Sequence, residues 1–238
     1  MPQAFSSGLT SPLDWINGIA PVAPNLSVDW IKHEVLIKLR YFFQRSHAWR
    51  CWVGPVNLQP GISAYSIEPT DYKAQIVSVI NAYRMSDTYP LSPVDSYDHN
   101  ADAMTDIPGG PAYYYQTPER LVHIFPVLKD GDTESVRLFI SMMPTDLCVP
   151  DWIKEQHYDA IREGVLSKVY LTPGINYKPD LGARLEKRFR SEISKAARDA
   201  VASYNDQVVS IATPAPFAMI GTNQQGRSAQ RSVSGRRW

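Results

Sequence analysis

The spacing of apolar residues changes twice along this chain, and the order of the changes limits the folds open to it. Residues 28–47 carry apolar side chains at intervals of three and four, which predicts a helix. Residues 53–143 carry short β-branched and aromatic runs between Gly and Pro turn signals, which is typical of strands. Helical spacing returns over 150–204. This order favours an α+β fold and disfavours the alternating strand–helix order of nucleotide-binding folds.

The middle block is expected to form an antiparallel β module. Three of its runs, 76–83, 121–127 and 136–142, are rich in β-branched and aromatic residues. In the last run every second residue is aliphatic or Met, which predicts a strand with one buried face. The sequence Lys-Asp-Gly-Asp at 129–132 predicts a hairpin turn between the last two runs.

Helix signals flank this module on both sides. A short helix is expected around Leu13–Ile19, with Ser11 or Asp14 near its start, and Ser27 is the predicted N-cap of the helix over 28–47. Beyond the module, one helix opens at Pro150-Asp151 and ends near Leu171. A second helix over 179–204 would be about 39 Å long at about 1.5 Å per residue. Its apolar stripe consists of Leu181, Leu185, Phe189 and Ile193.

Four segments are therefore predicted. They are a lead-in and first helix over 1–52, an inserted β module over 53–146, a helical hairpin over 147–204, and an extended C-terminal arm over 205–238. The first helix and the hairpin are expected to form a helical bundle. The arm has no acidic residue after Asp206, is rich in Pro, Gly and Ser, and is not expected to fold alone.

Composition narrows the function classes. The charge is balanced at 24 basic and 24 acidic residues, which argues against a dedicated nucleic-acid-binding protein. No apolar run approaches the roughly 18 residues of a membrane helix, and the N-terminus lacks the pattern of a secretory signal. We expect synthesis in a cytoplasm. Cys51 and Cys148 have no metal-site or disulfide spacing and are expected to be buried free thiols.

Motifs for catalysis are scarce. The Gly109-Gly110-Pro111 sequence is too short for a phosphate loop, and no two of the five histidines are three or four residues apart. We therefore expect a non-enzymatic protein without a cofactor or a metal. One stretch leaves an alternative open, because Asp95, Asp98, His99 and Asp102 in the loop 92–111 have the ligand types for a hard cation. A solvated loop with Asp and Asn capping its turns is the other interpretation.

The helical hairpin carries a recognisable pattern. In its first helix the pattern consists of Trp152-Ile153, Ala160-Ile161, Gly164 and Leu166, and in its second of Leu181, Arg188-Phe189, Ile193 and Ala196–Ala200. Over residues 150–201 the chain resembles the adaptor, or head–tail connector, proteins of tailed bacteriophages, including those similar to tail tubular protein A. One departure is Gly182, which stands in the first turn of the long helix where a helix-forming residue is expected.

The resemblance implies a structural virion protein at the head–tail junction, made in the host bacterial cytoplasm. Such proteins form a ring, usually of twelve subunits, that docks under the portal and extends the DNA channel. The implied partners are further copies of this chain, the portal protein and a tail or nozzle protein, with non-specific contact to DNA in the channel and no membrane.

Two groups of residues are candidates for the subunit or portal interface. On the polar side of the long helix they are Arg184, Lys187, Arg188, Arg190, Lys195 and Arg198. On the arm they are Phe217, Met219, Ile220, Arg227, Arg231, Arg236, Arg237 and Trp238. The helical group can face an acidic neighbour, the DNA channel or only solvent. Small residues expected to let the helices approach closely are Gly164, Ala183, Ala196, Ala197 and Ala200.

Two rival functions come from other classes. A carbohydrate- or ligand-binding β module on a helical stalk is suggested by Tyr113, Tyr114 and Tyr115, because adjacent tyrosines can form a stacking platform. Alternation of the three tyrosines through a strand is the plainer interpretation. A metal-dependent hydrolase would use Asp95, Asp98, His99 and Asp102.

Overall fold

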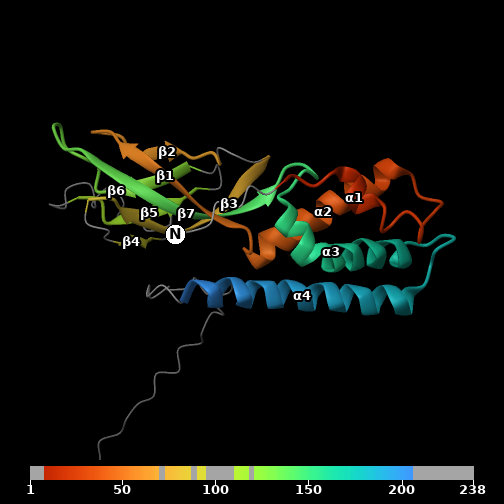
Figure 1. Ribbon diagram of the computed structural model, residues 1–238. Coiled ribbons are helices and arrows are strands. Elements are labelled where there is room, and N and C mark those ends of the chain that lie inside the picture. The colour runs from red at the N-terminus through yellow and green to blue at the C-terminus, as the bar shows by residue number, and fades with distance from the viewer. Residues whose placement is uncertain (1–7, 70–72, 87–89, 95–109, 118–120, 206–238) are drawn as a thin grey trace, which may run out of the picture. The chain divides into compact units, whose positions relative to one another are not determined.

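The computed structural model describes residues 8–69, 73–86, 90–94, 110–117 and 121–205. Within these ranges it contains four helices and a seven-stranded sheet, so the predicted α+β class is confirmed (Figure 1). By its contacts the chain divides into residues 1–204 and 205–238. The interface residues predicted on the arm, from Phe217 to Trp238, lie outside the described residues.

The helices begin and end where local signals place them. They are α1 (Pro12–Ile16), α2 (Val28–Ser46), α3 (Asp151–Leu171) and α4 (Pro179–Asn205). Ser11, rather than Asp14, caps α1, and its hydroxyl accepts a hydrogen bond from the Leu13 amide. The hydroxyl of Ser27 accepts one from the Trp30 amide at 3.2 Å, which confirms the predicted cap of α2.

The strands form one mixed sheet. They are β1 (Arg50–Leu58), β2 (Ala64–Ser66), β3 (Ala74–Arg84), β4 (Pro90–Pro93), β5 (Tyr113–Gln116), β6 (Leu121–Phe125) and β7 (Glu134–Pro144). Their order is β1-β7-β3-β4-β5-β6-β2, and the β4–β5 pair is parallel. The expectation of a purely antiparallel module is therefore wrong at this pair. The division into four segments stays a prediction, and β1 crosses its boundary after residue 52.

The predicted hairpin before β7 is also wrong. The turn itself forms, since the Asp132 amide donates to the Lys129 carbonyl at 3.1 Å and Gly131 has a φ of 91°. The strands on either side of the turn are not neighbours, however, because β6 pairs with β5 and β2. The eleven-residue β7 instead lies between β1 and β3, which are long enough to pair along most of its length.

Strand β7 is the centre of the core. Its predicted inward residues, Val136, Leu138, Ile140 and Met142, have no exposed surface. Phe139 and Ser141 on the other face are buried as well, so the prediction of a single buried face is wrong for this part of the strand. The ring of Phe139 packs against that of Trp52 on β1, with centroids 4.8 Å apart, and Oγ of Ser141 lies 2.9 Å from Nδ1 of His47 at the end of α2. Cys51 and Cys148 are free thiols, as expected, but both are only half-buried.

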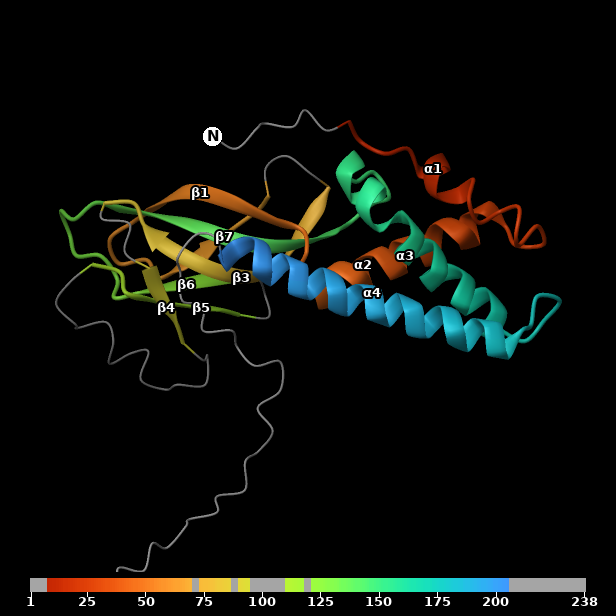
Figure 2. The same cartoon turned by 60° about the horizontal axis from the view of Figure 1, so that its bottom comes forward.

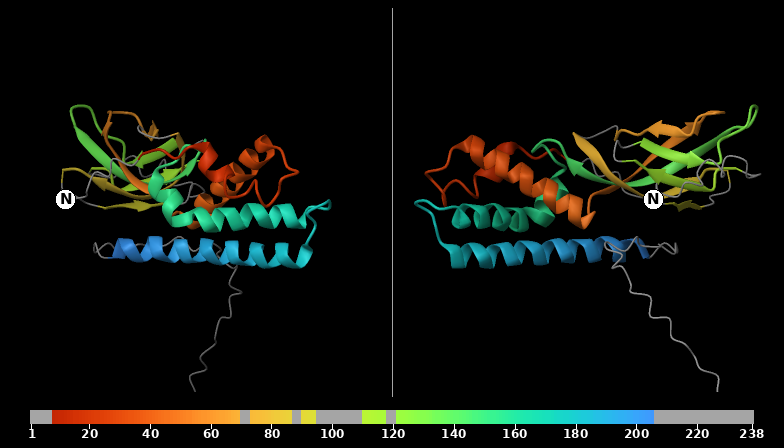
Figure 3. Two further views of the ribbon diagram at one scale, coloured as in Figure 1. Left: turned by 45° about the vertical axis from the view of Figure 1, so that its right-hand side comes forward. Right: turned by 180° about the vertical axis from the view of Figure 1, so that it is seen from behind.

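The helices meet around Phe189. This α4 side chain has no exposed surface, and its ring lies 6.2 Å from that of Phe42 on α2. A Cβ on Gly164 of α3 would lie 3.0 Å from the same ring, which confirms the close approach predicted at Gly164. Ala183, by contrast, is exposed on α4. In every view α4 runs alongside α3, on the side away from α1 (Figures 1, 2 and 3).

Gly182, the unexpected glycine at the start of α4, is also explained by a close approach between helices. A Cβ on Gly182 would lie 2.7 Å from Cγ of Leu171, at the end of α3. That separation is far below a normal carbon–carbon contact. Glycine lowers the helix propensity of the first turn of α4, but any side chain there would collide with Leu171 at the connection between the two helices.

No helix in the described part of the chain combines the length and the apolar character needed to cross a membrane.

Candidate assembly surfaces

The six basic residues predicted on α4 are all exposed, and they divide into two groups. Arg188 pairs with Glu163 at 3.2 Å, Arg190 with Glu186 at 3.0 Å, and Lys195 with Glu192 at 3.9 Å. Arg184, Lys187 and Arg198 have no ion-pair partner among the described residues. Exposed ion pairs of this kind contribute less than about 1 kcal/mol each to stability. The unpaired group is therefore the part of this face that keeps its charge available for a partner.

Glu186 holds three helices together. Its carboxylate accepts hydrogen bonds from Lys38 of α2 at 3.4 Å, from Ser167 of α3 at 2.9 Å and from Arg190 at 3.0 Å. Burial raises the pKa of Glu186, but the hydrogen bonds from Arg190, Ser167 and Lys38 outweigh it, so the pKa lies below its ordinary value. The Glu186–Arg190 spacing is visible in the sequence, whereas the other two donors come from distant elements and were not predicted.

Arg50 joins the C-terminal part of α4 to the sheet. Its Nε donates to the His47 carbonyl at 2.6 Å, and its Nη1 donates to the Ala200 carbonyl at 2.8 Å. His47 has a left-handed backbone with a φ of 49° and ends α2. Its Nδ1 lies 2.9 Å from Oγ of Ser141 on β7. Burial, with a contribution from the Arg50 charge, lowers the pKa of His47.

Apolar side chains are exposed at the end of the helices away from the sheet. Leu171, Ile175 and Tyr177, at the connection between α3 and α4, are 41%, 87% and 50% exposed. The α1–α2 connection lies at the same end in all views (Figures 1, 2 and 3). Clustered exposed apolar residues mark interaction surfaces in soluble proteins. We call Leu171, Ile175 and Tyr177 the helix-end patch.

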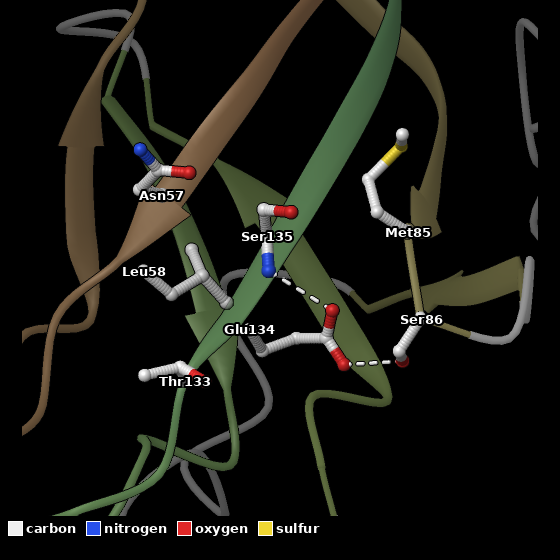
Figure 4. A pocket seen from close by; sticks show the side chains of 7 residues that line it. All are labelled: Asn57, Leu58, Met85, Ser86, Thr133, Glu134 and Ser135. Carbon is white, nitrogen blue, oxygen red and sulfur yellow. Dashed lines mark hydrogen bonds between the residues drawn. The ribbon is translucent and has the colours of Figure 1, made fainter.

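A shallow pocket lies where the end of β1, the residues after β3 and the start of β7 come together (Figure 4). Its volume is about 480 Å³, and it is lined by Asn57, Leu58, Met85, Ser86, Thr133, Glu134 and Ser135. Glu134 is the one carboxylate among these residues. Its oxygens accept hydrogen bonds from the Ser86 hydroxyl at 2.5 Å and from the Ser135 amide at 2.9 Å. The pocket lining therefore offers no second acid or base to work with Glu134.

The rival functions gain no support from the described residues. Tyr113, Tyr114 and Tyr115 alternate through β5, and the ring of Tyr115 stacks on that of His123 with centroids 4.5 Å apart. These two rings cover one another's faces, which leaves less surface for stacking on a sugar. Within the described ranges no group of three or more His, Cys, Asp or Glu residues is placed to hold a metal. The proposed ligands from Asp95 to Asp102 lie outside those ranges.

Comparison with known families agrees with the resemblance seen in the helical hairpin over residues 150–201. A family model described as SU10 adaptor protein matches residues 9–212, which include all four helices and all seven strands. The chain belongs to the SU10 adaptor protein family. No curated protein matches the chain. Membership confirms the resemblance to phage adaptor proteins in general and makes the chain a structural component of a virion that interacts with other virion proteins.

The SU10 adaptor match separates the two groups of predicted interface residues. The six basic residues of α4 lie inside the matched range. The arm residues from Phe217 to Trp238 lie beyond it. The six basic residues of α4, the helix-end patch and the contacts of Arg50 with His47 and Ala200 therefore all lie in the part of the chain that the family model matches.

Proposed function

We propose that this chain forms the adaptor ring between the portal and the tail, as a non-enzymatic protein of the tail tubular A-like type. The observation that carries the proposal is the family match over residues 9–212. The ring contains twelve subunits, binds the portal on one side and a tail or nozzle protein on the other, and extends the DNA channel. It takes its place at the head–tail junction after synthesis in the host cytoplasm.

A subunit of such a ring contacts its two neighbours through two different surfaces and needs further surfaces for the portal and for the channel. The described residues offer surfaces of contrasting chemistry. The helix-end patch is apolar, and the outward side of α4 is basic. Buried apolar side chains dominate the energetics of stable protein interfaces. We therefore assign the helix-end patch to a protein contact with the portal.

The test mixes the purified chain with portal particles and follows association by light scattering and cryo-EM. We expect the chain to be a 26.8 kDa monomer alone and a ring on the portal. Changing Ile175 and Tyr177 to Ser is expected to weaken association. The matched control changes Ile62 and Met85 to Ser, since these are 42% and 45% exposed but lie on the sheet module. Failure of the wild-type chain to associate with any portal particle would overturn the proposal.

A further inference from the structure

The outward side of α4 carries a continuous polar strip. We define the α4 outer strip as Arg184, Lys187, Ser191, Ser194 and Arg198, whose side chains are all exposed. Their spacing of three, four, three and four residues places them on one side of the helix. The apolar stripe through Leu185, Phe189 and Ile193, which is half-buried at Leu185 and buried at the other two, occupies the opposite side.

The strip keeps its positive charge. Its three basic side chains have no ion pair within the described residues, while the other three basic residues of α4 are paired with Glu163, Glu186 and Glu192. Glu186 and Glu192 lie on other sides of α4, and Glu163 lies on α3. Over the fourteen steps from Arg184 to Arg198 the helix rises about 21 Å, at about 1.5 Å per residue.

The composition of the strip distinguishes between two classes of partner. No large apolar residue is exposed on the described part of α4. Protein interfaces are enriched in aromatic residues, Met and Arg and are depleted in Lys and Ser. The strip has Lys187, Ser191 and Ser194 among its five residues and no aromatic residue or Met. Protein–DNA interfaces are instead polar and strongly positive, and Arg, Lys and Ser side chains are typical phosphate ligands. The strip fits the second class.

We infer that the α4 outer strip binds the phosphate backbone of duplex DNA without sequence preference. A length of about 21 Å spans about six base pairs, since successive nucleotides of one strand rise about 3.4 Å. The inference deepens the proposed function and rests on it, because a ring around the DNA path presents one such strip from every subunit. A single chain offers only three cationic contacts, so its own binding is weak and strongly dependent on salt.

The test measures fluorescence anisotropy of a labelled random-sequence duplex with the full-length chain at several low salt concentrations. The strip variant carries Arg184→Ser, Lys187→Ser and Arg198→Ser. The control variant carries Arg45→Ser, Lys129→Ser and Lys168→Ser, three exposed residues away from the strip. Both variants lower the net charge by three. At about −0.9 per phosphate contact, the slope of log affinity against log salt is expected to weaken by about 2.7 in the strip variant and to stay near the wild-type value in the control.

The same proteins are also tested for association with portal particles. A wild-type slope in the strip variant overturns the inference and, if portal association is normal, leaves the adaptor function standing. A strip variant that binds DNA normally but no longer joins the portal also overturns it, and identifies an acidic protein surface as the partner. A weakened slope with intact portal association supports the inference.

Discussion

Acidification should destabilise this protein through one histidine. His157 of α3 lies among aromatic rings, with centroids 4.8 Å from Phe42, 5.9 Å from Phe43 and 6.5 Å from Trp152. Burial lowers its pKa from 6.5 to about 4. The unfolded chain therefore binds a proton on His157 at a higher pH than the folded protein does. The free energy of unfolding is not reduced by this histidine above pH 6.5, and it decreases as the pH falls from 6.5 toward 4.

The loss can be estimated from the two pKa values. At about 1.36 kcal/mol per pKa unit, the shifted pKa of His157 lowers the free energy of unfolding by about 2 kcal/mol at pH 5 and by about 3 kcal/mol at pH 4. The assay is urea unfolding at pH 7.5, 6 and 5 for the wild type and for His157→Phe, which keeps an aromatic ring in the cluster. His47 and His123, whose pKa values burial also lowers, are present in both proteins and cancel in the difference.

We expect the wild type to lose about 2 kcal/mol more than His157→Phe between pH 7.5 and pH 5. The control is His33→Gln, which removes an exposed histidine of α2 that lies outside the aromatic cluster. Equal pH dependence in the wild type and His157→Phe would refute the argument, because it would mean that the ring is protonated in the cluster without cost.

Three further predictions concern the helices. Phe189→Ala should lower the free energy of unfolding by about 3–5 kcal/mol, because it empties the centre of the helical packing, and urea unfolding measures this loss. Gly182→Ala should cost about 1–3 kcal/mol, since the added Cβ meets Leu171, whereas the same change would raise stability if helix propensity decided the outcome. Arg50→Met should speed hydrogen exchange in the C-terminal part of α4 around Ala200, and unchanged exchange there would show that the Arg50 hydrogen bond does not stabilise this part of the helix.

The sequence predicts the helices well because their signals are local. The expected ranges 28–47 and 179–204 differ by one residue each from α2 and α4. Caps, turn residues and three-to-four spacing lie within each helix and need no knowledge of the rest of the chain. The exposed side of α4 follows from the same spacing, which is why its six basic residues are correctly placed on the surface.

The sequence does not determine which strands pair with one another or which distant charged side chains form ion pairs. Alternation from Val136 to Met142 predicts a strand, but nothing in it indicates that β7 pairs with β1 and β3 rather than with β6. The ion pair of Arg188 has the same origin, because its partner is Glu163 on another helix, whereas Arg190 and Lys195 pair with acids of α4 itself. Strand order, the Arg188–Glu163 ion pair and the burial of Ser141 all depend on residues far apart in the chain.

The pairing of β1 with β7 has a consequence for synthesis. The residues of β1 meet partners that the ribosome adds roughly 80 residues later, between Glu134 and Ser141. At about 5–20 residues per second, β1 waits about 4–16 s for its neighbour, and α2 waits still longer for α4. A truncated nascent chain therefore lacks both the central ladder and the closing helix. Synthesis through α4, rather than folding of an early fragment, therefore sets the earliest moment at which the central ladder and the helical packing can both form.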